Sequence, residues 1–99
     1  MEMFTHTNID GYLPWLQANW SGFVVNFRWK GGKHLVVHRA TCRDIARANV
    51  NYGRKGDESG KVCSSDITEL RDWSSKTYGK PLDPCGHCLA GSDWPSDHA

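Results

Sequence analysis

The chain has 99 residues, of which 38% are hydrophobic and 23% are charged, and its formal net charge is +1. This length predicts a single domain with a small core, for which a metal ion or a partner is a useful further source of stability. No run approaches the roughly 20 apolar residues of a membrane span, and the first residues lack the basic start and apolar run of a signal peptide. We therefore expect a cytoplasmic monomer that does not contact a membrane.

The N-terminal part of the sequence predicts one helix, with an Asn or Asp cap near its start, that ends at about Asn19. Leu13, Leu16 and Trp20 are spaced so that they share one face of such a helix. We expect this apolar face to be the buried one.

A hairpin is predicted next, because two runs rich in β-formers, 22–29 and 34–38, flank Gly31-Gly32. Side chains alternate between the two faces of a strand. The face that we expect to be core contains Phe23, Val25, Phe27 and Trp29. The face that we expect to be exposed contains Val24, Asn26 and Arg28.

The second half predicts a short helix over 42–50, a loop over 51–60 rich in Gly and charge, and a short strand over 61–64. A longer helix follows, starting at Ser65 or Asp66 and ending at Tyr78. Asp66 and Glu69 have the spacing of a capping box, which satisfies free N–H groups at a helix start.

Two pairs of metal-binding residues lie far apart in this sequence. Cys85 and Cys88 form a C-x₂-C pair, whose spacing lets two thiolates reach one ion from a tight turn. His38 ends the second predicted strand and Cys42 opens the next helix, so their side chains can converge on one point. Three Cys and one His form a common tetrahedral zinc set. The sequence therefore predicts Zn²⁺ as cofactor, bound by His38, Cys42, Cys85 and Cys88.

Cys63 and His87 are alternative ligands. Cys63 in place of His38 would give a site of four cysteines, whereas His87 lies inside the C-x₂-C turn and is expected to point away. Four protein ligands leave no open position for water. We therefore expect a structural site, and a chain that is not an enzyme.

The fold class that these elements predict is α+β. We expect a small antiparallel sheet of two to three strands with flanking helices, closed by one structural zinc ion. Residues 1–99 would form one zinc-binding domain, with 1–7 and 90–99 flexible.

Basic residues gather in the middle of the chain. Segment 28–61 contains nine Lys or Arg residues and three Asp or Glu residues, a local charge of +6. A basic surface attracts phosphate groups, an Asn can hydrogen-bond a base edge, and an exposed Trp29 or Trp94 would stack on an unpaired base. The candidate nucleic-acid contacts are Asn26, Arg28, Arg39, Arg43, Arg54 and Lys55. The alternative is that these residues serve the fold and pair with neighbouring groups.

Between Trp15 and about Leu89 the sequence also contains a series of short motifs in a fixed order. They are GFVVN, HRATC, KVC, a predicted helix that contains a Trp, and CGHC. In this pattern the chain resembles a small zinc-binding domain of actinobacterial proteins of restriction and defence character. It is more distantly similar to the zinc domain of the adaptive-response DNA repair protein, which binds DNA and transfers a methyl group from a phosphotriester to its first cysteine. His38 occupies that position here, and imidazole is not such a nucleophile. The resemblance therefore implies the scaffold and a DNA-binding surface without the methyl transfer.

These observations lead to one function and two alternatives. The first is a zinc-stabilised module that binds DNA or RNA. The second is a protein-interaction or purely structural zinc domain. The third is a thiol–disulfide redox protein, because CGHC is also a redox motif, although the chain lacks the alternating strand–helix pattern and the long helix after CGHC that this reading needs.

Overall fold

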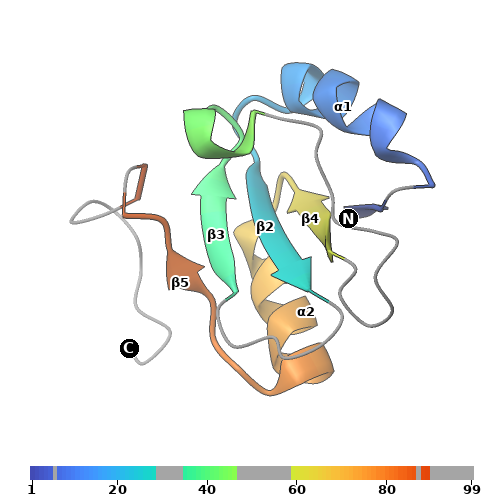
Figure 1. Cartoon of the computed structure of the whole chain (residues 1–99). Coiled ribbons are helices and arrows are strands. Elements are labelled where there is room, and N and C mark those ends of the chain that lie inside the picture. The colour runs from blue at the N-terminus through green and yellow to red at the C-terminus, as the bar shows by residue number, and fades with distance from the viewer. Residues whose placement is uncertain (6, 29–34, 47–58, 87, 90–99) are drawn as a thin grey trace.

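The computed structural model describes residues 1–5, 7–28, 35–46, 59–86 and 88–89. Within these residues a five-stranded mixed sheet is accompanied by two α-helices and two short 3-10 turns (Figure 1). The elements in chain order are β1 (Glu2–Phe4), η1 (Ile9–Gly11), α1 (Tyr12–Ala18), β2 (Phe23–Arg28), β3 (Val36–Arg39), η2 (Arg43–Ile45), β4 (Ser59–Ser64), α2 (Ile67–Tyr78) and β5 (Asp83–Pro84).

The strand order in the sheet is β1-β4-β2-β3-β5, and all neighbours are antiparallel except β3 and β5. The α+β class is confirmed, but the sheet is larger than the predicted two to three strands and is not wholly antiparallel. The two unpredicted strands are the edges, which have three and two residues. Such short segments give no alternating pattern. One of them, β1, lies within segment 1–7, which the sequence predicts to be flexible.

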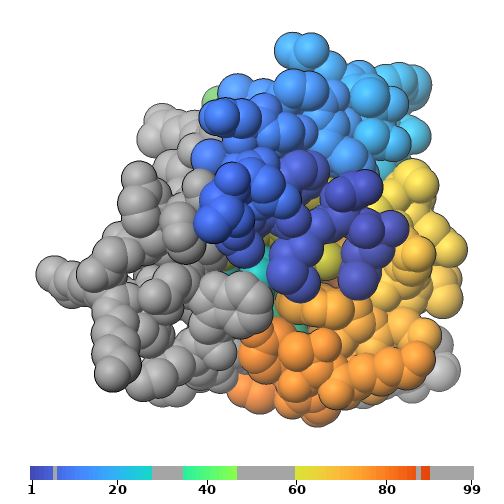
Figure 2. All heavy atoms as spheres, turned by 90° about the vertical axis from the view of Figure 1, so that its right-hand side faces the viewer, coloured from blue at the N-terminus to red at the C-terminus, as the bar shows by residue number. Residues whose placement is uncertain are grey.

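Both faces of the sheet are covered. Val24 of β2 pairs with His38 on one side and Cys63 on the other, and it packs in one core with residues of α1 and η2. Val25 and its neighbours face the opposite way and form a second core with α2. The prediction that this face of β2 is exposed to solvent is therefore wrong at Val24, whose exposed fraction is 0%. Figure 2 shows the N-terminal segments lying against β4 and α2.

The helix α2 has the predicted bounds and clear end signals. Asp66 Oδ1 accepts a hydrogen bond from the Thr68 amide (2.9 Å), and Gly79 ends the helix with φ 65°. The predicted capping box takes another form. Ser64 Oγ donates to Glu69 Oε1 (2.6 Å) and accepts from the Asp66 amide (2.9 Å), so a serine hydroxyl stands between the two acidic residues.

The helix α1 uses a different buried stripe from the predicted one. Tyr12 and Leu16 are buried, and the Tyr12 hydroxyl donates to the carbonyl oxygen of Ile45. Leu13 and Trp20 are 41% and 69% exposed, because Leu13 is one position off this stripe and Trp20 lies beyond the helix end. No helix in the described part of the chain is long and apolar enough to cross a membrane.

The predicted helix 42–50 is represented only by η2, which is a single 3-10 turn. Residues 47–50, the predicted loop up to residue 58 and the predicted flexible segment 90–99 lie outside the described residues.

The short strand β5 brings the C-terminal part of the chain to β3. The amide of Asp83 donates to the Leu35 carbonyl and the amide of Cys85 donates to the Val37 carbonyl, each at 2.9 Å. Pro84 lies between them at a position whose N–H is not needed by β3, and proline has none. The pairing therefore fixes where Cys85 begins its turn.

A lysine is buried on the α1 side of the sheet. Lys61 is 4% exposed, its Nζ donates to Asn26 Oδ1 (2.7 Å), and it lies 5.1 Å from the centre of the Tyr12 ring. Burial lowers the pKa of this amine. Its partners within the described residues are an amide oxygen and an aromatic ring, and neither carries a full negative charge. The ammonium is therefore only partly compensated for its lost hydration.

We expect Lys61→Met to raise the free energy of unfolding by about 1 kcal/mol, because methionine fills similar space without a buried charge. Urea unfolding at pH 7 measures this. In the natural chain, the loss of stability caused by burying the charged Lys61 is fully present below the folded-state pKa of this amine. It disappears as the pH rises toward the pKa of Lys61 in the unfolded chain, because the unfolded chain holds the proton more tightly. A clear loss of stability in Lys61→Met would mean that the bond to Asn26 outweighs the desolvation.

Candidate metal centre

The first half of the centre is built by the tight turn that ends β3. His38 lies on the covered α1 side of the sheet, opposite Val24. The chain then turns, with the Cys42 amide donating to the Arg39 carbonyl (2.9 Å) and the Ile45 amide donating to the Cys42 carbonyl (3.2 Å). This turn places Cys42 at the start of η2, directly beyond the end of the strand.

The second half is the turn after β5. Cys85 is anchored to β3 by its amide, and the Leu89 amide donates to the Cys85 carbonyl (3.0 Å), which closes the turn that contains Cys88. Leu89 is buried in the α2-side core. The C-x₂-C pair is therefore fixed at both ends, by the sheet on one side and by a core residue on the other.

The structure brings together the four side chains that the sequence predicts as ligands. One ligand atom from each of His38, Cys42, Cys85 and Cys88 lies within 4.8 Å of all the others. The Cys42 and Cys85 sulfurs are 4.0 Å apart, close to the separation of about 3.8 Å that tetrahedral Zn–S bonds of 2.3 Å require. His38, Cys42 and Cys85 are buried and Cys88 is half-buried. The group is positioned to bind one metal ion.

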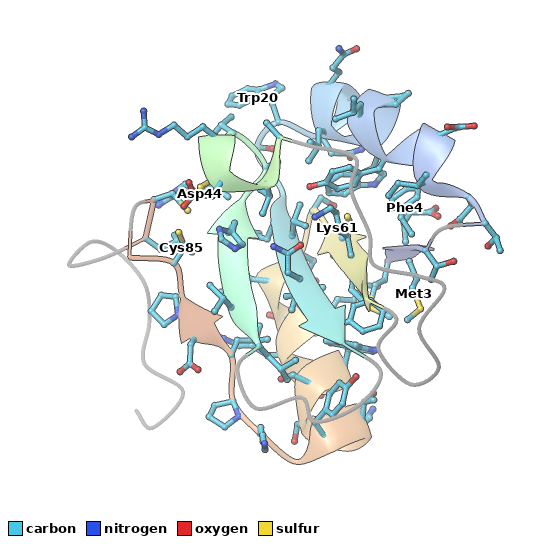
Figure 3. The ribbon with its side chains drawn as sticks, viewed as in Figure 1. Met3, Phe4, Trp20, Asp44, Lys61 and Cys85 are labelled. Atoms are coloured by element: carbon cyan, nitrogen blue, oxygen red, sulfur yellow. The ribbon has the colours of Figure 1, made fainter. Side chains whose placement is uncertain are left out.

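The raised pKa of a thiol in this group couples metal binding to proton release. Burial raises the pKa of Cys88 to about 12, so without a metal ion this thiol keeps its proton at neutral pH. Metal ligation requires the thiolate, so metal binding must release protons and must weaken as the pH falls. Nearby, the Cys85 sulfur lies 3.8 Å from Asp44 Oδ2, and Figure 3 shows these two residues next to each other below η2.

Arg39 is part of this centre. Its amide donates to Cys88 Sγ (3.2 Å), and its Nε donates to the Cys88 carbonyl oxygen (3.1 Å). Three thiolates and a neutral imidazole around a divalent ion leave one excess negative charge, which the guanidinium offsets. The sequence places Arg39 among the nucleic-acid contacts, whereas in the structure it binds the half-buried ligand. No local sequence signal reveals this contact, which spans 49 positions.

The rival ligand Cys63 does not join the group. Cys63 lies on β4 with Val24 of β2 between it and His38, and strands are about 4.8 Å apart, so roughly 10 Å separates their backbones. Burial raises the pKa of Cys63 to about 12, as expected for an apolar core position. His87 lies outside the described residues.

Of the other predicted nucleic-acid contacts, the structure describes the side chains of Asn26 and Arg43. Asn26 lies on the covered face and accepts the bond from Lys61, so it serves the fold. Arg28 ends β2, and its side chain is not described. Arg43 is exposed on η2. Arg54 and Lys55, like Trp29 and Trp94, lie outside the described residues.

Comparison with known proteins gives one distant relative. The chain is 27% identical over 95 residues to the probable E3 ubiquitin-protein ligase ARI15 of Arabidopsis thaliana. The alignment covers 92% of this chain but 21% of that protein, so the chain spans about a fifth of the relative's length. No family model and no solved structure matches the chain. The resemblance to actinobacterial zinc domains therefore stays a prediction.

We expect one divalent metal ion per chain in protein purified under reducing conditions, and none in His38→Ala or Cys85→Ser, because each variant removes one of four converging donors. Elemental analysis with a thiol count measures this. Cys63→Ala is the matched control and should keep its metal. Metal retained in His38→Ala but lost in Cys63→Ala would contradict the assignment.

We expect Arg39→Met to lower the metal affinity about tenfold, because groups that orient a ligand typically contribute 10- to 100-fold. Competition with a coloured chelator measures the affinity. Arg43→Met is the control, since this arginine is exposed and its guanidinium makes no hydrogen bond or ion pair with a described residue. An equal loss of metal affinity in both variants would mean that general positive charge, and not the hydrogen bond from Arg39 to Cys88, raises the affinity.

Proposed function

We propose that this chain is a zinc-stabilised binding module and not an enzyme, and that its target is nucleic acid. Zinc is the ion favoured by three thiolates and one imidazole in a tetrahedral group. Four protein donors leave no position for a water or a substrate, which supports a structural role for the ion. The ion joins the end of β3 and η2 to the turn after β5. It thereby fixes the surface that η2 carries.

The observation that carries the nucleic-acid target is the environment of Arg43. Its side chain is exposed, and its guanidinium makes no hydrogen bond or ion pair with any described residue. The adjacent carboxylate, Asp44, is directed toward Cys85 and does not neutralise it in the described part of the chain. Arg43 also belongs to segment 28–61, with its local charge of +6. A free guanidinium on a rigid, metal-anchored turn is suited to bind a phosphate.

Salt-dependent binding to labelled DNA and RNA tests this proposal. We expect affinity to fall as salt rises, because phosphate contacts release counterions. Arg43→Ala should weaken binding to all sequences and reduce the magnitude of the log–log salt slope by about 1. Lys76→Ala is the matched control, because Lys76 is an exposed cation on α2 that pairs with Asp72 (3.2 Å). An equal effect of both variants, or no binding by the natural chain, would refute the proposal.

A protein partner is the alternative target. Exposed apolar side chains on and just after α1, Leu13 and Trp20, support it, as does the distant relative named as a ubiquitin ligase.

A thiol–disulfide redox function is the third possibility. It requires metal-free protein with a reversible Cys85–Cys88 disulfide, so the metal and thiol analysis separates it from both binding readings.

A further inference from the structure

The turn between α1 and β2 presents a tryptophan to solvent on a well-fixed backbone. Trp20 is 69% exposed and belongs to neither core. The turn around it is held by backbone bonds from Asn19 to the Trp15 carbonyl (2.9 Å) and from Gly22 to the Asn19 carbonyl (2.8 Å). The side chain therefore projects from a rigid support without contributing to the packing of the described cores.

Substitution at Gly22 would disturb this support. A Cβ at that position would lie 3.0 Å from the Ser64 carbonyl oxygen and 3.0 Å from the Trp15 ring. The turn is therefore packed closely against both β4 and α1, and a larger residue at position 22 would force its neighbours to shift. An exposed indole leaves most of its large apolar area in water, where a ligand can reach it.

The turn that carries Trp20 lies beside the one that carries the metal-anchored arginine. The Ala40 amide donates to the Gly22 carbonyl (2.9 Å), and Phe23 pairs with Arg39, so the start of β2 and the end of β3 share one end of the sheet. Figure 3 shows Trp20 directly above η2, while Asp44 lies on the other side of that turn, next to Cys85. The turns that contain Trp20 and Arg43 therefore lie at one end of the sheet, and the carboxylate of Asp44 is directed toward Cys85.

We infer that Trp20 stacks on an unpaired base while Arg43 binds an adjacent phosphate, so that the ligand is single-stranded nucleic acid. This inference rests on the proposed function and narrows it. A flat aromatic face beside a cation is the arrangement that single strands use, because every base has a face to stack but exposes it only when unpaired. An exposed arginine on the neighbouring turn distinguishes this end of the sheet from an apolar interface, where charged residues are depleted.

Fluorescence anisotropy with a labelled thymidine oligonucleotide, and with the same label on a duplex, tests the inference. We expect the single strand to bind more tightly than the duplex. Trp20→Ala should weaken single-strand binding about tenfold or more, while Trp20→Phe retains most of the affinity because it keeps an aromatic face. Leu13→Ala is the matched control, since it removes another exposed apolar side chain from the same region and should change nothing.

The salt dependence separates the two roles. Trp20→Ala should keep the salt slope of the natural chain, because stacking releases no counterions, whereas Arg43→Ala should reduce it. Circular dichroism and metal content establish that each variant is folded.

The possible failures are distinguishable. If the natural chain binds no nucleic acid, the proposed function and this inference both fail. If it binds and Trp20→Ala binds equally well, or if duplex and single strand bind equally, the inference alone is overturned. If sedimentation shows a dimer that Trp20→Ala dissociates, the indole covers a second copy of the chain and the inference is also overturned.

Discussion

The convergence of four donor atoms at one end of β3 is the constraint on which the rest of this domain depends. Cys42 and Cys85 stand 43 positions apart, and their sulfurs lie 4.0 Å from each other. Ordering so long a connection costs conformational entropy. The two hydrogen bonds that β5 makes to β3 contribute only about 1 kcal/mol each, whereas a structural zinc ion contributes on the order of 10 kcal/mol. A metal ion held by these four side chains would therefore be the strongest single link between the C-terminal turn and the rest of the fold.

The two cores differ in chemistry, and the difference follows from what covers each face. The α2 side is covered by one helix of twelve residues with clear end signals, and its buried residues are apolar apart from Ser64 and Ser74. The other side is covered by three short elements, and it contains buried cysteines and Lys61. The first face provides the rigid part of the sheet. The second contains the candidate metal centre.

Local signals in the sequence were sufficient for some of these features. The Asp66 cap and Gly79 define the ends of α2. The spacing within the two pairs of candidate ligands identifies the four side chains that could hold a metal ion. Alternation in β2 correctly separates two sets of side chains, but it does not tell whether a face is covered, because that depends on segments elsewhere in the chain. The position of Val24 shows this limit.

Features that depend on contacts between residues far apart in the chain could not be predicted from the sequence, because a local pattern does not show which distant segments meet. The edge strands are too short for a periodic pattern, and β5 contains a proline. Arg39 has the composition of a phosphate contact, yet it binds a backbone carbonyl 49 positions away. Trp20 continues the spacing of α1 in sequence, although the helix has already ended at Ala18. For the edge strands and for Arg39, the residues that decide the structure are far away in the sequence.

The proline in β5 has a consequence for how this molecule behaves in concentrated solution. In a parallel edge strand alternate N–H groups face inward and outward, and the inward ones here belong to Asp83 and Cys85. The outward position is Pro84, which has no hydrogen to donate. That two-residue edge therefore offers no outward N–H to an added strand, and together with the exposed charge of Asp83 this disfavours edge-to-edge polymerisation through β5.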